Sequence, residues 1–179
     1  MIPETPYIAL IPTGDEVVSG LIIDTDSPAL MGEALRRWPG SSILRHPPVK
    51  DSEDGITGAV KEQVEAGAWL VVIIGGSGGG HRFTDTLAPD YSCGALRALF
   101  PEAATGEVWG SNGHLFSAMS VARHDGGWAI NVPGPQAEAV AAFRAAVDGI
   151  ESGREPDRIA EEMAKAVARQ YPGVCNPKA

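Results

Sequence analysis

The spacing of apolar residues along the chain predicts a regular alternation of strands and helices. Residues 7–11, 41–45 and 70–74 have the pattern of short strands, and the last of these is an unbroken aliphatic run suited to burial on both faces. Residues 30–38 and 56–64 instead carry apolar side chains at helical spacing. The order strand, helix, strand, helix, strand is typical of an α/β domain with a parallel sheet.

Polar and small residues mark the boundaries of both helices. Asp26 or Ser27 can cap the first helix, with Pro28 near its first position. Ser52 can cap the second helix, and Gly67 can end it. Each predicted helix is therefore bounded where the strand pattern stops and resumes.

The second half of the chain has shorter and less regular segments. The expected strands are 106–110, 116–123 and 128–132, and the expected helices are 91–100, a segment that follows residue 135 and runs to about 150, and 156–170. We expect residues 1–152 to form one α/β domain. We expect residues 153–179 to form a C-terminal amphipathic helix and tail, packed on that domain or on a neighbouring subunit.

Length, charge and cysteine content narrow the class of protein. A chain of 179 residues is large enough for one domain with its own core. Its net charge of -9 argues against a general nucleic-acid-binding protein, and no apolar run reaches the roughly 18 residues of a membrane span. The two cysteines lack metal-ligand spacing and suggest no disulfide framework, so the sequence favours the reduced cytoplasm.

A glycine-rich segment follows directly on the most apolar predicted strand. Glycine allows positive φ angles and lets the backbone come close to a ligand. In open α/β sheets, ligands bind outside the carboxyl ends of the strands, where successive N–H groups can surround an anion. We therefore predict an anion-binding loop rather than a flexible surface loop. Its residues are Gly75, Gly76, Ser77, Gly78, Gly79 and Gly80.

Two further loops should meet this one at the same edge of the sheet. One is Asn131-Val132-Pro133-Gly134-Pro135 with the start of the helix that follows it. The other carries carboxylates, which can hold Mg²⁺, whereas a helix N-terminus favours phosphate. The combination predicts a site for a phosphorylated small molecule with Mg²⁺, although these acids could instead be only a helix cap and a solvated turn. They are Asp15, Glu16, Asp24 and Asp26, preceded by Thr13.

Four landmarks, in their order along the chain, resemble the molybdopterin-binding fold. They are PTGDE at 12–16, DTD at 24–26, VVIIGGSG at 71–78 and NVPG at 131–134. Molybdopterin adenylyltransferase, the central domain of molybdopterin molybdenumtransferase and the competence-damage-type nucleotide pyrophosphatase domain share this fold. The resemblance spans roughly residues 7–150 and implies a three-layer α/β sandwich with a mostly parallel central sheet. Because small members are commonly trimers, it also implies a homo-oligomer, with a trimer favoured.

The resemblance also implies roles for individual residues. The glycine loop would hold the terminal phosphate of molybdopterin or the phosphates of a nucleotide. Ser117 and the Pro133-Gly134 turn would lie at the pterin side. Asp24 and Asp51 would be the acidic positions after the first and second strands. Asp24, Asp51 and Asp85 would hold Mg²⁺, with Asp51 and Asp85 acting in catalysis.

One departure from the family's pattern affects the expected chemistry. In the family the glycines lead to an aspartate followed two residues later by threonine, whereas here Phe83 and Asp85 stand at those positions. A two-residue shift moves a carboxylate by roughly 6–7 Å along an extended chain. The arginine usual beyond Ser117 is also absent, and Ala118 stands there. Either Asp85 substitutes for the missing acid, or the site binds without adenylyl transfer.

Three functions stay open on this basis. The first is molybdenum-cofactor biosynthesis acting on molybdopterin, by adenylyl transfer from Mg-ATP or by metal insertion. The second is a nucleotide pyrophosphatase, but Arg82-Phe83 replace the paired aspartates typical of that branch. The third is a non-catalytic pterin-binding module, which would tolerate the lost aspartate.

Overall fold

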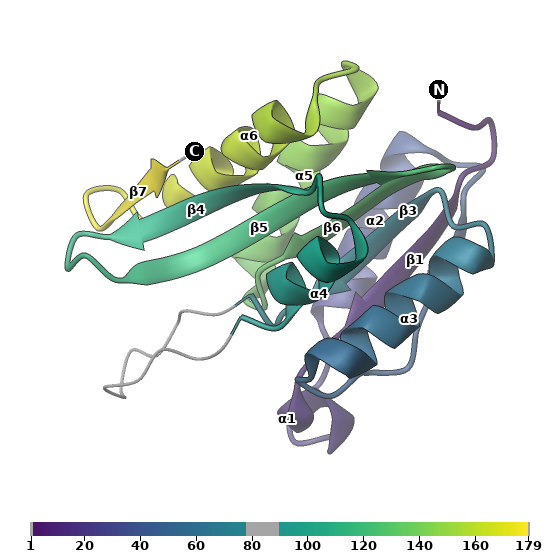
Figure 1. Cartoon of the computed structure of the whole chain (residues 1–179), viewed down its shortest axis with the longest axis horizontal. Coiled ribbons are helices and arrows are strands. Elements are labelled where there is room, and N and C mark those ends of the chain that lie inside the picture. Colours follow the sequence, from purple (N-terminus) through teal and green to yellow (C-terminus); the bar gives the residue numbers. More distant parts are fainter. Residues whose placement is uncertain (1, 78–89, 179) are drawn as a thin grey trace.

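Seven strands form one sheet within residues 2–77 and 90–178, the part of the chain that the computed structural model describes. Its order is β2-β1-β3-β6-β5-β4-β7 (Figure 1). The first four strands pair in parallel and the remaining pairings are antiparallel. The strands are β1 (Tyr7–Pro12), β2 (Ser42–Arg45), β3 (Leu70–Ile74), β4 (Ala104–Gly110), β5 (Leu115–His124), β6 (Gly127–Val132) and β7 (Cys175–Lys178).

Helices cover both faces of this sheet, which confirms the expected three-layer α/β architecture. The helices are α1 (Asp15–Val18), α2 (Asp26–Arg37), α3 (Glu53–Glu65), α4 (Ser92–Leu99), α5 (Gln136–Glu151) and α6 (Pro156–Ala168). One face packs against α2, α5 and α6, and the other against α3 and α4. The sheet is mixed: its parallel half holds the predicted strand–helix alternation, and its antiparallel half is built from the later strands.

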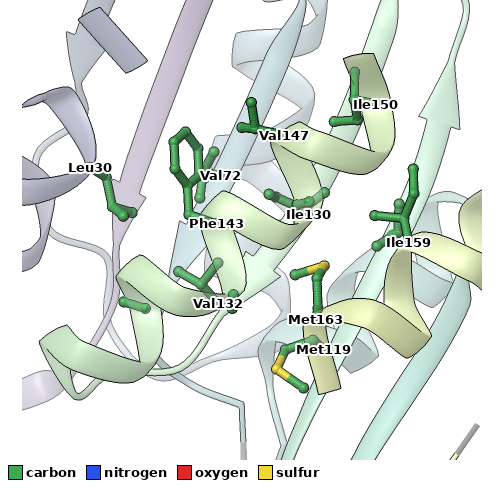
Figure 2. Close-up of a cluster of buried hydrophobic side chains, with 14 of the residues drawn as sticks. Leu30, Val72, Met119, Ile130, Val132, Phe143, Val147, Ile150, Ile159 and Met163 are labelled. Carbon is green, nitrogen blue, oxygen red and sulfur yellow. The ribbon is translucent and has the colours of Figure 1, made fainter. Parts of the chain in front are cut away.

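Alternate residues of the central strand β3 pack into two separate hydrophobic cores on opposite faces of the sheet. Leu70, Val72 and Ile74 face the larger core, and Val71 and Ile73 face the smaller one. All five are buried, as the unbroken aliphatic run predicts. Figure 2 shows the larger core, where side chains from α2, β3, β6, α5 and α6 meet. Burying one such aliphatic side chain contributes about 1.5–3 kcal/mol to folding.

The C-terminal helix α6 belongs to the larger core of its own chain. Ile159, Met163 and Val167 recur at i, i+4 and i+8 and are all buried (Figure 2 labels the first two). The helix approaches β4 so closely that a Cβ added at Gly106 would lie 2.1 Å from the carbonyl oxygen of Ala160. Only glycine fits at that point, so the packing of α6 on the sheet depends on it.

Several local features differ from the expectation. The four-residue helix α1 and the strand β7 were not anticipated, because α1 is too short to show a period and β7 contains Pro177. A proline is tolerated there because β7 lies at the edge of the sheet. Leu35, expected on the buried stripe of α2, is 44% exposed. The predicted cap at Ser52 is confirmed, since its side chain accepts a hydrogen bond from the amide of Gly55.

Candidate functional site

A cavity of about 870 Å³ opens at the carboxyl ends of β1, β3 and β6, beside the first residues of β5. The three loops predicted to converge all contribute to its wall, so that convergence is confirmed. The wall residues are Pro12, Thr13, Gly14, Asp15, Glu16, Val17, Ile22, Ile23, Asp24, Asp26, Asp51, Ile74, Gly75, Gly76, Ser77, Tyr91, Phe116, Ser117, Pro133, Gly134, Pro135, Glu138 and Tyr171.

The glycine turn at the end of β3 requires glycine for two reasons. Gly75 and Gly76 have φ angles of 89° and 62°, which side chains with a Cβ rarely adopt. A Cβ at either position would also lie 3.1 Å from Oγ1 of Thr13. Thr13 is held in place because both its amide and its hydroxyl donate to the carbonyl oxygen of Ile74. The turn is therefore fixed against the end of β1 and exposes its backbone to the cavity.

Ser77 and Ser117 connect this turn to the start of β5. Their Oγ atoms lie 3.4 Å apart, and both residues are buried. Either hydroxyl can donate to the other. Ser117, expected at the pterin side, thus lies next to the glycine turn. The remaining residues predicted for this loop, Gly78, Gly79, Gly80 and Asp85, lie outside the described residues.

Asp51 brings a buried carboxylate oxygen to the same place. Its Oδ1 lies 3.6 Å from where a Cβ on Gly76 would stand. Within the described residues this buried oxygen has no hydrogen-bond partner. Burial raises the pKa of Asp51, and the charges of Glu16 and Asp15 raise it further. A positively charged ligand at this point would stabilise the ionised carboxylate.

Asp24 has a structural role in addition to its place in the cavity wall. Its Oδ1 accepts hydrogen bonds from the first amides of α2, those of Asp26 and Ser27, and its Oδ2 pairs with Nε of Arg45 at 2.7 Å. Burial alone would raise the pKa of Asp24, but the Ser27 hydrogen bonds and Arg45 hold it below its usual value. The side chain that caps α2 is therefore Asp24, and the expectation of a cap at Asp26 or Ser27 was wrong.

Asp26 is strained electrostatically by its neighbour. Its buried Oδ1 has no hydrogen-bond partner among the described residues. Burial, followed by the charge of Asp24, raises the pKa of Asp26 to about 6. A raised pKa means that the folded protein binds a proton that the unfolded chain has already released, so this group destabilises the fold as pH rises from its ordinary pKa of about 4 to about 6.

We expect Asp26→Asn to stabilise the protein at pH 7.5 and to remove this pH dependence. The gain should be about 1 kcal/mol, after allowing for solvent screening of a partly exposed group. Urea unfolding at pH 4, 5, 6 and 7.5 would measure it as the difference between variant and wild type. Asp157→Asn, an exposed acid in the first turn of α6, is the control. A difference that stays constant from pH 4 to 7.5 would contradict the expectation.

The charges on the cavity wall are all negative among the described residues. No arginine, lysine or histidine appears there, whereas six acids do. A phosphate bound to this wall alone would be repelled, so an anionic ligand requires a cation with it. The acids are Asp15, Glu16, Asp24, Asp26, Asp51 and Glu138. Within residues 2–77 and 90–178, no three acidic, histidine or cysteine side chains are grouped closely enough to hold a metal by themselves.

Among the aromatic and acidic residues of the wall, sequence reasoning missed Tyr91, Phe116, Glu138 and Tyr171. Glu138 lies in the first turn of α5 and is only 2% exposed. An acid at the buried face of a predicted helix was the available signal. For Tyr171 no local signal exists, because the turn after α6 brings it to the cavity.

Asn131, part of the third predicted loop, does not line the cavity. It is fully buried and connects β6 to β5 and α4. Its Nδ2 donates to the carbonyl oxygen of Ala118 and to Oγ of Ser92, and its Oδ1 accepts from the amide of Ser120. Asn131 therefore fixes the beginning of β5, which carries Ser117.

The family of the chain follows from a sequence comparison. Residues 9–151 match the family described as "Probable molybdopterin binding domain", and the chain belongs to this family. No curated protein sequence matches it. The predicted membership of the molybdopterin-binding family is thus confirmed. No helix in the described parts of the chain is long and apolar enough to cross a membrane.

Solved structures show the same fold at low sequence identity. The molybdopterin biosynthesis Mog protein from Mycobacterium ulcerans is 18% identical, with 87% of this chain and 100% of that chain covered and a TM-score of 0.61. A putative molybdenum cofactor biosynthesis protein from Corynebacterium diphtheriae is 16% identical, covering 89% and 98%, with a TM-score of 0.61. The protein CinA from Thermoplasma acidophilum is 20% identical, covering 83% and 99%, with a TM-score of 0.57. These similarities confirm the predicted molybdopterin-binding fold.

Proposed function

We propose that this protein binds molybdopterin through its terminal phosphate, together with Mg²⁺, in molybdenum-cofactor biosynthesis. One observation carries the proposal: the positive-φ turn at Gly75 and Gly76 exposes the end of β3 to a cavity in a member of the molybdopterin-binding family. Backbone amides in such a turn can surround phosphate oxygens. The N-termini of α2 and α5 lie at the same cavity and favour the same charge.

The residues of the wall fit a divalent cation. The buried Oδ1 of Asp51 has no hydrogen-bond partner in the described structure, and burial, followed by the charges of Glu16 and Asp15, raises the pKa of its carboxyl group. Mg²⁺ in proteins is usually held by one or two carboxylates, with phosphate oxygens and water completing its shell. A Mg²⁺ ion at this wall therefore does not need three protein ligands. Asp51 is the described residue that we assign first to this role, with Asp24 and Asp85 as further candidates.

In a catalytic version of this proposal, an oxygen of the terminal phosphate of molybdopterin attacks the α-phosphate of Mg-ATP. The new bond gives adenylylated molybdopterin, and the bond to the β-phosphate breaks to release pyrophosphate. Bound Mg²⁺ would neutralise phosphate charge. The chain's own contribution would be to orient that phosphate on the glycine turn, with Asp51 and Asp85 as the catalytic acids. The metal-insertion, non-catalytic and nucleotide pyrophosphatase alternatives use the same cavity, so the product separates them.

Calorimetric titration of molybdopterin with and without Mg²⁺, followed by addition of Mg-ATP and a product assay, tests the proposal. We expect Mg²⁺ to strengthen binding in the wild type and Asp51→Asn to remove about 10- to 100-fold of that gain. Asp54→Asn, an exposed acid three residues further along, is the control.

Each outcome assigns a function. Adenylylated pterin would establish the transferase, whereas pterin binding without nucleotide binding would favour metal insertion or a non-catalytic module. Nucleotide hydrolysis without pterin would indicate the pyrophosphatase. Absence of molybdopterin binding in the wild type would refute the proposal.

We further propose that the protein is a cytoplasmic homotrimer. Light scattering on the purified chain would test the oligomeric state.

A further inference from the structure

Tyr171 reaches the cavity from a segment beyond the family match. The match ends at residue 151, whereas Tyr171 follows α6 and lines the wall with the family's own loops. The turn after α6 positions it: its amide donates to the carbonyl oxygen of Ala168, and its carbonyl oxygen accepts from Val174 and Cys175. The strand β7 then pairs with β4 and anchors this segment to the sheet. The C-terminal segment therefore completes part of the cavity wall.

The ring of Tyr171 is held against both α5 and β5. Its hydroxyl donates to Oε1 of Glu138, a nearly fully buried acid in the first turn of α5. Its ring packs against Phe116, with ring centroids 4.9 Å apart and the planes inclined by 59°. Both aromatic residues are partly exposed and both line the cavity. Two aromatic rings thus form an apolar corner in a wall whose charged groups, among the described residues, are all acids.

This aromatic corner is adjacent to the glycine turn. Phe116 directly precedes Ser117, whose Oγ lies 3.4 Å from Oγ of Ser77. Across the sheet edge, five of the six wall acids follow β1 and β2, and the glycines follow β3. Beyond β6, Phe116 at the start of β5 lies against Tyr171, which is bonded to the sixth acid, Glu138. The cavity therefore has an acidic side, a backbone turn in the middle and an aromatic side.

We propose that Phe116 and Tyr171 form the subsite for the planar heterocycle of the ligand, with the C-terminal segment setting specificity for it. This inference rests on the proposed function. If the terminal phosphate of molybdopterin binds at the glycine turn, the pterin ring of the same molecule would lie beside Phe116 and Tyr171. Planar rings stack on or against the edges of aromatic side chains. Glu138 contacts the hydroxyl of Tyr171, and this hydrogen bond adds to the packing against Phe116 that orients the ring.

The test compares two substitutions of Tyr171 with three ligands. Tyr171→Leu removes the ring, and Tyr171→Phe keeps the ring but removes the hydroxyl. The ligands, each titrated with Mg²⁺ present, are molybdopterin, unphosphorylated pterin as a ring alone, and inorganic phosphate as an anion alone. We expect Tyr171→Leu to bind both ring compounds about ten-fold more weakly and phosphate unchanged, whereas Tyr171→Phe stays within about three-fold of wild type.

Tyr7 provides a matched control. Its hydroxyl also donates to a side chain, Gln63, at 2.7 Å, but it lies outside the cavity wall. Tyr7→Leu should lower stability in urea without changing the affinity for any of the three ligands. If Tyr171 only packs against the core, Tyr171→Leu would behave in the same way, and the proposal would be overturned.

The failure of the proposed function can be told apart from the failure of this inference. If Tyr171→Leu binds molybdopterin as tightly as wild type does, the ring subsite is wrong while molybdopterin binding stands. If wild type binds no molybdopterin, the same series is repeated with ATP and guanosine triphosphate. A Tyr171-dependent affinity for either would support a ring subsite for another heterocycle, and the absence of ring binding by every probe would overturn it.

Discussion

Gly75→Ala should weaken ligand binding by at least about 100-fold and also lower the free energy of unfolding by about 2–4 kcal/mol. Part of this loss comes from backbone strain, because an L residue with positive φ costs roughly 1–2 kcal/mol. The remainder comes from crowding, since the new Cβ would lie 3.1 Å from Oγ1 and 3.3 Å from the carbonyl oxygen of Thr13. Forcing an extra carbon into a packed site typically costs about 1–3 kcal/mol.

Binding should suffer as well as stability because relief of this contact displaces the turn itself. Thr13 cannot move freely, since its amide and hydroxyl are both hydrogen-bonded to Ile74. The turn must therefore shift away from β1, carrying the backbone amides that would surround the phosphate. We expect the affinity for molybdopterin to fall by at least about 100-fold, because positional errors near 1 Å are costly at such sites.

Gly67→Ala separates backbone strain from the ligand site. Gly67 has a φ of 85°, close to that of Gly75, but a Cβ there would meet no atom within 4 Å. It ends α3 and lies outside the cavity wall. In this variant, only backbone strain should lower the free energy of unfolding, which urea unfolding would measure. Its affinity for the ligand, measured by calorimetry, should equal that of wild type. Equal affinities for Gly75→Ala and wild type would mean that the turn does not contact the ligand.

The elements that the sequence predicted correctly are those whose burial repeats with a clear period. β3 is apolar at every position because both faces are covered, and α6 shows an apolar residue every fourth position. The strand β7 has no such signal. Only Cys175 in it is buried, and its pairing with β4 is made by backbone groups. Edge strands are specified by their neighbours, so a single-sequence pattern cannot reveal them.

The same reasoning separates the predicted from the unpredicted parts of the site. The loops after β1, β3 and β6 were predictable because parallel strands place their carboxyl ends at one edge. Sequence could not show which side chain in a loop faces the ligand. Asp24 is predicted as a metal ligand and lines the cavity, but the sequence did not show that its oxygens also cap α2 and pair with Arg45. Asn131 was included in a site loop, yet it is a buried structural residue.

Asn131→Leu should therefore be among the most destabilising single changes in the chain. Leucine keeps a similar size but cannot replace the hydrogen bonds to the amide of Ser120, 2.5 Å away, and to the carbonyl oxygen of Ala118, 3.0 Å away. The carbonyl oxygen of Ala118 would keep only the weak thiol donor of Cys93. Oγ of Ser92 would also lose its bond to Asn131. Each buried polar group left without a partner costs about 1–3 kcal/mol. We expect a total loss of about 3–5 kcal/mol in urea unfolding.

Asn112→Leu is the control for this substitution. Its Oδ1 also accepts from a backbone amide, that of His114, but in an exposed turn where water can replace the bond. It should cost less than about 1 kcal/mol. If Asn131→Leu were no more destabilising than this control, the network around Asn131 would contribute little to stability.

Asn131→Asp makes the prediction specific to hydrogen-bond donation. An ionised carboxylate can still accept from Ser120, but it would repel the carbonyl oxygen of Ala118 to which Nδ2 now donates. A protonated carboxyl group could make both bonds, so burial should raise the pKa of the new aspartate above its ordinary value of about 4. The folded state then binds the proton more tightly than the unfolded chain, and stability is lost as pH rises through the raised pKa. Asn131→Asp should accordingly be close to wild type at about pH 4 and increasingly less stable towards pH 7. Asn131→Leu should show a deficit that does not depend on pH, because leucine cannot be protonated.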